Sequence, residues 1–170
     1  MVNGKNLEDF IMRHAISVLV ENKFGVLARI ATLFAARGFN IDSLAVGETE
    51  DPNVSSMTII VSGNDKILEQ VEKQLNKLID VIKVSDYKEA KHVERELALI
   101  KVKANRADRS EIMQIVDIFR AKIIDVSSDS VIVEMTGDEE KITALMVMLQ
   151  PFGIREMSRT GIIAMGRGKK

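Results

Sequence analysis

The chain has 170 residues, which suffices for one domain or two small ones. Its 46% hydrophobic residues support a packed core, while 24 basic against 25 acidic residues leave no excess positive charge for a nucleic-acid partner. The absence of cysteine excludes disulfides and a cysteine nucleophile. No apolar run approaches the roughly 20 residues of a membrane span. With no signal-peptide pattern either, we expect a cytoplasmic protein that uses no membrane.

The first half of the chain alternates between strand and helix patterns. Residues 1–12 precede any periodic pattern and are expected to form an extension. Residues 15–20 are rich in β-branched side chains and predict a strand. Residues 26–37 have helical periodicity, and Gly38 follows as a helix-terminating glycine. A second strand is expected over 40–46.

The same half ends with a strand, a helix and a strand. Residues 56–62 alternate between polar and apolar, which predicts a strand. Leu68, Val71, Leu75 and Leu78 then recur at helical spacing, and 81–84 predicts a fourth strand. The predicted order is therefore β-α-β-β-α-β.

A charged stretch, 89–96, is expected to link this half to a second copy of the same order. Strands are predicted over 97–102, 123–126, 131–135 and 154–164, with a bend at Gly161. The first helix of this half can be capped by Asp108 or Ser110, and the second follows Gly137 and Asp138.

The sequence thus predicts an α+β protein of two tandem ferredoxin-like βαββαβ units, each with two helices on one face of an antiparallel sheet. The expected boundaries are an extension at 1–12, a first unit at 13–88, a linker at 89–96 and a second unit at 97–170. Apolar residues occupy both faces of the first strand, with Ile16 on one face and Leu19 on the other. Small units with such two-sided strands commonly pair, so we expect a homodimer.

The turn before the first helix is the candidate binding site. Residues 21–29 run from a strand directly into the helix, whose first N–H groups have no carbonyl partner inside it. Such a helix start suits a carboxylate. Asn22 offers both a donor and an acceptor, but it is equally compatible with a plain helix cap, and the local pattern leaves both interpretations open. Asn40 follows the same helix at its other end, so the two asparagines are expected to meet only across a dimer.

No residue pattern in the chain predicts catalysis or metal binding. His14 begins a strand and His92 lies in the expected linker, and neither has a neighbouring Ser or Asp at a triad spacing. The acidic stretches 48–51 and 138–140 are typical of a solvated loop and a helix start, and neither has the spacing of a calcium loop. We therefore expect no catalytic residue and no metal site.

Several segments in order resemble one known family. They are His14 to Asn22 with Gly25 to Arg29, Leu33-Phe34, Arg37 to Ile41, Asp51-Pro52, Met57 to Ile59, Leu68 to Leu75, Arg95 to Leu97, Phe119 to Val126 and Ser158 to Gly161. Together they resemble the regulatory (small) subunit of acetolactate synthase, also called acetohydroxyacid synthase. The first unit is similar to an ACT domain. The likeness runs from about Met12 to Gly168, and residues 1–11 have no counterpart in it.

The resemblance implies a function without catalysis on this chain. Such subunits bind the catalytic large subunit, activate it and confer feedback inhibition by valine in branched-chain amino-acid biosynthesis. Thiamine diphosphate, Mg²⁺ and FAD would then belong to the large subunit. In the family, ACT domains dimerise and valine lies between them. The corresponding effector-binding positions here are Asn22, Gly25, Val26, Leu27, Asn40 and Ile41.

Two other functions remain open from the residues alone. A free-standing amino-acid-sensing ACT protein would bind valine but no enzyme, and a purely structural ferredoxin-like dimer would bind neither. The second unit lacks a glycine in the turn 105–108, so we assign no valine site there.

Overall fold

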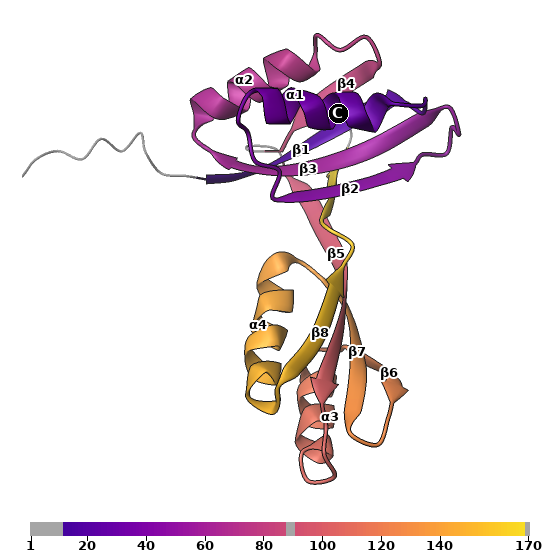
Figure 1. Cartoon of the computed structure of the whole chain (residues 1–170), viewed down its shortest axis with the longest axis vertical. Helices are drawn as coiled ribbons and strands as arrows, with labels where there is room; N and C mark the ends of the chain where they lie inside the picture. The colour runs from indigo at the N-terminus through magenta and orange to yellow at the C-terminus, as the bar shows by residue number, and fades with distance from the viewer. Residues whose placement is uncertain (1–11, 88–90, 169–170) are drawn as a thin grey trace, which may run out of the picture. The chain divides into compact units, whose positions relative to one another are not determined.

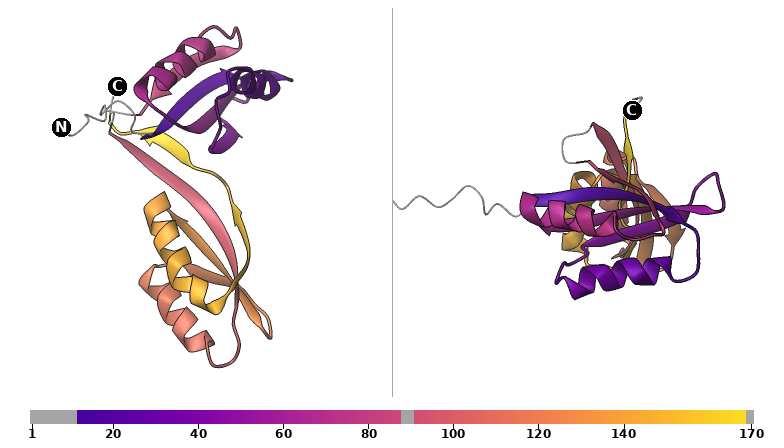
Figure 2. Two further views of the ribbon diagram at one scale, coloured as in Figure 1. Left: turned by 60° about the vertical axis from the view of Figure 1, so that its left-hand side comes forward. Right: turned by 90° about the horizontal axis from the view of Figure 1, so that it is seen from above.

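The computed structural model describes residues 12–87 and 91–168. The chain divides into two compact units. Unit 1 comprises the described residues up to Val93 together with residues 163–168, and unit 2 comprises residues 94–162. Each unit has two helices on one face of an antiparallel sheet (Figures 1 and 2). The predicted α+β fold of two ferredoxin-like units is confirmed.

Unit 1 has the strand order β2-β3-β1-β4. Its elements are β1 (Met12–Glu21), α1 (Val26–Ala36), β2 (Ser43–Glu48), β3 (Val54–Gly63), α2 (Asp65–Leu75) and β4 (Val81–Asp86). The central strands β1 and β3 are in register from Met12 opposite Gly63 to Glu21 opposite Val54. Both helices pack on the face formed by Ile16, Val18 and Val20, which are all buried.

Unit 2 repeats this arrangement with the strand order β6-β7-β5-β8. Its elements are β5 (His92–Lys103), α3 (Arg109–Ile118), β6 (Lys122–Val126), β7 (Ser130–Gly137), α4 (Glu139–Leu149), the short 3₁₀ helix η2 (Gln150–Phe152) and β8 (Ile154–Arg159). The first two residues of β5 fall in unit 1. Its core joins the inner face of β5 and β7 to the apolar sides of α3 and α4.

Of the four α-helices in the described part of the chain, two begin with a side-chain capping bond. The side chain of Asn64 accepts a hydrogen bond from the Ile67 N–H, and that of Asp138 accepts one from the Lys141 N–H. For α3, one of the two predicted cap residues is at the N-cap position, but it makes no capping bond. Asp108 holds the N-cap position without a side-chain bond, and Asn105 instead accepts from the N–H groups of Ala107 and Asp108.

Element ends differ from the sequence prediction where strand pairing decides them. Met12, placed in the extension, is the first residue of β1, and its pairing with Gly63 on β3 explains this. The strand predicted over 40–46 is found at Ser43–Glu48, because its pairing with β3 starts at Ser43 opposite Ile60. Leu78, predicted in the second helix, follows its end and still packs partly against the core.

The predicted linker and final strand were also partly wrong. Residues 92–96 belong to β5, whereas residues 89–90 lie outside the described residues. The expected strand at 154–164 is two strands, β8 and β9 (Ile163–Gly166), separated near Gly161, which has a φ of 81°. Hence the C-terminal boundary also moves, because β9 belongs to unit 1.

β9 lies on the face of the unit 1 sheet that the helices leave open. It contacts β1 and β3, and the Ala164 N–H donates to Thr58 Oγ1 on β3 at 3.2 Å. The Arg167 N–H donates to the Lys91 carbonyl at 2.8 Å. On this face Thr58 and Ile60 are buried, although they are not part of the core that α1 and α2 cover. The chain itself thus covers part of the sheet face that the helices leave open.

Candidate functional site

The turn between β1 and α1 is held against the loop between β2 and β3. The Asn22 N–H donates to the Asn53 carbonyl at 2.7 Å. The Asn22 amide group also donates to Glu48 Oε1 at 3.1 Å and to the Pro52 carbonyl at 2.9 Å. Both donors of that amide are therefore used inside the chain, while no described residue donates to its oxygen. Asn22 is not a helix cap, and its exposed oxygen is left as an acceptor.

Gly25 occupies the N-cap position of α1 in a left-handed conformation, with φ 84°. No side chain caps this helix, and its first turn contains no acidic residue. The Val26 N–H approaches the Lys23 carbonyl at 3.4 Å, and the Arg29 N–H donates to the Gly25 carbonyl at 3.0 Å. The N–H groups of Leu27 and Ala28, between them, belong to the first turn that an α-helix leaves unpaired. This helix start is suited to an anion.

The side chains after Gly25 divide between core and surface. Val26 is 3% exposed and packs in the core of unit 1, so in the isolated chain only its backbone can face a ligand. Leu27 is 44% exposed, and Phe24 is fully exposed. An apolar ligand at this turn would therefore contact Leu27 rather than Val26.

Asn40 and Ile41 lie beyond the other end of α1. The Asn40 amide donates to Asp42 Oδ1 at 2.7 Å, and Ile41 is half-buried against the core of unit 1. The 11 residues of α1 separate these two positions from the turn at Asn22. Since an α-helix rises about 1.5 Å per residue, one chain does not bring the two groups together.

Charged residues fix the turn to the α2–β4 connection. The Glu21 N–H donates to the Asp80 carbonyl at 2.9 Å, and the Arg29 guanidinium lies 3.1 Å from the largely buried Asp80 carboxylate. The hydrogen bond to Glu21 raises the pKa of Lys23. Two cations therefore lie close to the start of α1.

Comparisons with known proteins agree over both units. Residues 16–83 match the family described as "AHAS small subunit-like ACT domain", and residues 95–168 match "Small subunit of acetolactate synthase". The chain belongs to the family of acetolactate synthase small subunits. Unit 1 contains its ACT domain.

Two relatives from distant organisms are similar over almost their full length. A "Probable acetolactate synthase small subunit" of Archaeoglobus fulgidus is 58% identical over 94% of this chain and 99% of its own length. The "Acetolactate synthase small subunit" of Mycolicibacterium smegmatis is 54% identical over 92% of each chain. The crystal structure of the acetolactate synthase small subunit from Thermotoga maritima has a TM-score of 0.85 at 48% identity, covering 94% of this chain and all of that one.

Two site features of this small subunit were missed from the sequence. The acidic run 48–51 was interpreted as a solvated loop, yet Glu48 accepts a hydrogen bond from Asn22. Asp80 anchors both Glu21 and Arg29. Neither contact has a local signal, because each joins residues from separate elements.

The two histidines are placed in structural contacts. His14 is buried with its Nε2 3.2 Å from the Gly63 carbonyl, and the His92 ring stacks on Tyr87 with centroids 5.1 Å apart. Across residues 12–87 and 91–168, no three His, Asp or Glu side chains are grouped so that they could hold a metal ion. Within the same ranges no helix has both the length and the hydropathy that crossing a bilayer requires.

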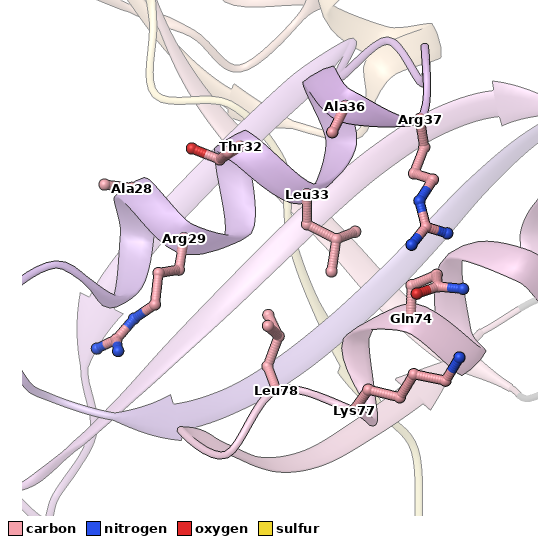
Figure 3. A pocket seen from close by; sticks show the side chains of 9 residues that line it. All are labelled: Ala28, Arg29, Thr32, Leu33, Ala36, Arg37, Gln74, Lys77 and Leu78. Carbon is pink, nitrogen blue, oxygen red and sulfur yellow. The ribbon is translucent and has the colours of Figure 1, made fainter.

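A groove of about 470 Å³ lies in unit 1 between α1 on one side and the last turn of α2 with the residues that follow it on the other (Figure 3), and is called here the groove between α1 and α2. Leu33 and Leu78 point toward each other across its centre, and Arg29 lies at one end. Arg37 and Lys77 lie at the other end, on either side of Gln74. No acidic side chain lines this groove.

Proposed function

We propose that this chain is the regulatory subunit of an acetolactate synthase, which activates the catalytic large subunit and confers feedback inhibition by valine. Membership of the small-subunit family supports the partnership with a large subunit. The chemical step, and with it thiamine diphosphate, Mg²⁺ and FAD, is assigned to the large subunit. This chain is proposed to carry no catalytic residue.

The proposed effector site rests on two groups that lie close together. The Asn22 side-chain oxygen has no donor among the described residues, and the first turn of α1 has N–H groups without a partner inside the helix. A free amino acid carries an ammonium and a carboxylate on neighbouring atoms. The Asn22 oxygen can accept from the ammonium, and the uncapped first turn of α1 after Gly25 can donate to the carboxylate. Leu27, which is partly exposed, can contact a branched side chain.

The remaining predicted positions require a second copy of the chain. Asn40 and Ile41 lie beyond the opposite end of α1 from Asn22. In a homodimer of ACT domains, Asn40 and Ile41 of one copy would complete the site begun by Asn22, Gly25, Val26 and Leu27 of the other. Val26 would contribute its backbone, because its side chain is in the core.

One reconstitution experiment tests this function. The purified chain is mixed with the large subunit of the same organism, acetolactate formation is assayed, and valine is then titrated. Activation followed by inhibition is the expected result. Valine binding without activation would instead support a free-standing amino-acid sensor, and neither effect would support a purely structural dimer.

Substitution at the turn tests the site itself. Gly25→Asp places a carboxylate where the ligand carboxylate is proposed to lie, and also strains the left-handed backbone. We expect valine binding, measured by calorimetry, to weaken at least tenfold. Gly47→Asp, at an exposed strand glycine with open space around it, is the matched control. Normal valine binding by the Gly25 variant would refute the assignment.

A further inference from the structure

The groove between α1 and α2 combines an apolar centre with unbalanced positive charge. Leu33 and Leu78 are half-buried, so the centre is apolar yet open to solvent. Arg29, at one end, is neutralised by Asp80. Arg37 and Lys77, at the other end, form no ion pair with any described residue. A groove of this kind attracts an occupant that has acidic groups next to an apolar surface.

The α1 side of the groove is made of small side chains. Ala28, Thr32 and Ala36 succeed one another at a spacing of four residues along α1, and all three are exposed. Residues four apart lie on the same side of a helix. Their small size lets another polypeptide approach the helix closely, which is the geometry of a segment lying in a groove.

The same helix carries the proposed effector site at its first turn. α1 begins immediately after Gly25, and Ala28 and Arg29 already line the groove. A ligand at the first turn and an occupant of the groove would therefore both contact α1. This gives a physical connection between an effector and a partner.

We propose that the groove between α1 and α2 is a docking site for a segment of the catalytic large subunit that carries carboxylates beside aliphatic side chains. The carboxylates pair with Arg37 and Lys77, and the aliphatic side chains contact Leu33 and Leu78. This assignment rests on the proposed function, because it takes the large subunit as the partner. It adds where on this chain that partner binds.

The test compares two groove variants with a charge-matched control. The double variant Arg37→Gln/Lys77→Gln removes two charges from the groove. Lys66→Gln/Arg106→Gln removes two exposed charges elsewhere. Ala36→Trp blocks the groove from an exposed helix position without changing its charge. Affinity for the purified, cofactor-loaded large subunit is measured by calorimetry at several salt concentrations, with activation of acetolactate formation as a second readout.

Both groove variants are expected to weaken binding of the large subunit at least tenfold and to reduce activation in parallel. The charge-matched control is expected to stay within twofold of wild type. Binding by the groove double variant should also depend less on salt, since screened charge pairs have been removed. Circular dichroism melts must match wild type, and an unstable Ala36→Trp is replaced by Thr32→Trp at another exposed groove position.

The outcomes separate the docking site from the function on which it rests. Groove variants that bind and activate within twofold of wild type would overturn the docking site alone. A wild-type chain that neither binds nor activates the large subunit would overturn the proposed function and the docking site together. Normal docking without any effect of valine would overturn only the proposed feedback.

Discussion

Gly25 holds a backbone conformation that most other residues adopt only at a cost. Its φ of 84° lies in the left-handed region, and a Cβ built there would meet no atom within 4 Å. Any penalty for a side chain at this position is therefore conformational rather than steric. The backbone conformation of the turn, and not the space around it, is therefore what favours glycine at this position.

We expect Gly25→Ala to lower the free energy of unfolding by about 1 kcal/mol through this strain. Gly47→Ala is the control, because a Cβ at Gly47 also meets open space and its φ is outside the left-handed region. Denaturant unfolding of both variants measures the difference. Equal stabilities would show that the turn relaxes without cost.

Residue types alone indicated where a ligand could bind but not how the site is held. The sequence alone did not decide whether Asn22 caps the helix or contacts a ligand. The structure assigns its two donors to Glu48 and Pro52, which are 26 and 30 residues away. Such contacts depend on the pairing of β2 with β3 and have no local signal. Val26 shows the same limit, because the family resemblance places it at the ligand while the structure buries its side chain in the core of unit 1.

Among the elements, α2 carries a carboxylate in an unfavourable setting. Burial, followed by the nearby charges of Asp86 and Glu69, raises the pKa of Glu72. A pKa raised in the folded state means that the ionised side chain opposes folding at neutral pH. The opposition is lost as the pH falls below the pKa of the unfolded chain, about 4.3.

Glu72→Gln is therefore expected to be more stable than wild type at pH 7 and equal to it near pH 3. Urea unfolding at the two pH values tests this. Asp129→Asn is expected to change the free energy of unfolding in the opposite direction, because the hydrogen bond from Arg155 lowers the pKa of Asp129. That variant should lose stability at pH 7, and the loss should disappear as the pH falls through the folded pKa. A Glu72→Gln gain that persisted at pH 3 would contradict the electrostatic explanation.

Strands β5 and β8 are joined by an ion pair that is largely withdrawn from water. Arg159 donates to both carboxylate oxygens of Glu96, whose side chain is 1% exposed. The pair Lys101–Glu156 links the same two strands, but its side chains are 37% and 67% exposed. The two pairs differ mainly in burial.

We expect Arg159→Met to cost roughly 3 kcal/mol, because it leaves a buried carboxylate without its partner. Lys101→Met should cost less than about 1 kcal/mol, as exposed pairs usually do. Adding Glu96→Leu to Arg159→Met should recover much of the loss, since the uncompensated charge is then gone. The free energies of unfolding are measured with denaturant, and similar costs for Arg159→Met and Lys101→Met would refute the argument.

Element types were predictable because hydrophobic periodicity decides them locally, whereas element ends were not. β2 starts three residues later than expected because pairing with β3 begins at Ser43. β5 starts within the predicted linker, where the charged residues 94–96 had suggested a solvated segment. Glu96 belongs in a strand because Arg159 neutralises it, and a residue 63 positions away is outside any local pattern.

At the scale of the whole molecule, unit 1 is not continuous in the sequence. β9 lies on the outer face of its sheet and is reached only after the chain has passed through unit 2. The hydrogen bond from the Ala164 N–H to the buried hydroxyl of Thr58 fixes β9 to β3. The repeated order of strands and helices predicted two units that follow each other in the sequence. It gave no sign that residues 163–168, which come after the second repeat, belong to unit 1.

Thr58→Val keeps the side-chain shape but removes the acceptor for Ala164. We expect it to cost about 1–2 kcal/mol, the usual penalty for a backbone donor left without a partner. Thr58→Ser retains the hydroxyl and should cost less. Hydrogen exchange should speed up at β9 and β3 in the valine variant while unit 2 is unchanged. Equal protection of β9 in the two variants would show that this bond does not hold the strand.

The position of β9 also has a consequence for how the protein is made. A ribosome completes the sequence of β1 to β4 long before it reaches residues 163–166. During that interval the outer face of the first sheet lacks β9, which lies against β1 and β3 in the finished chain. The nascent ACT domain therefore exposes an apolar surface until the second unit has been synthesised. An isolated fragment ending at Val93 would keep that surface exposed permanently, so such a fragment is a poor substitute for the intact chain in binding experiments.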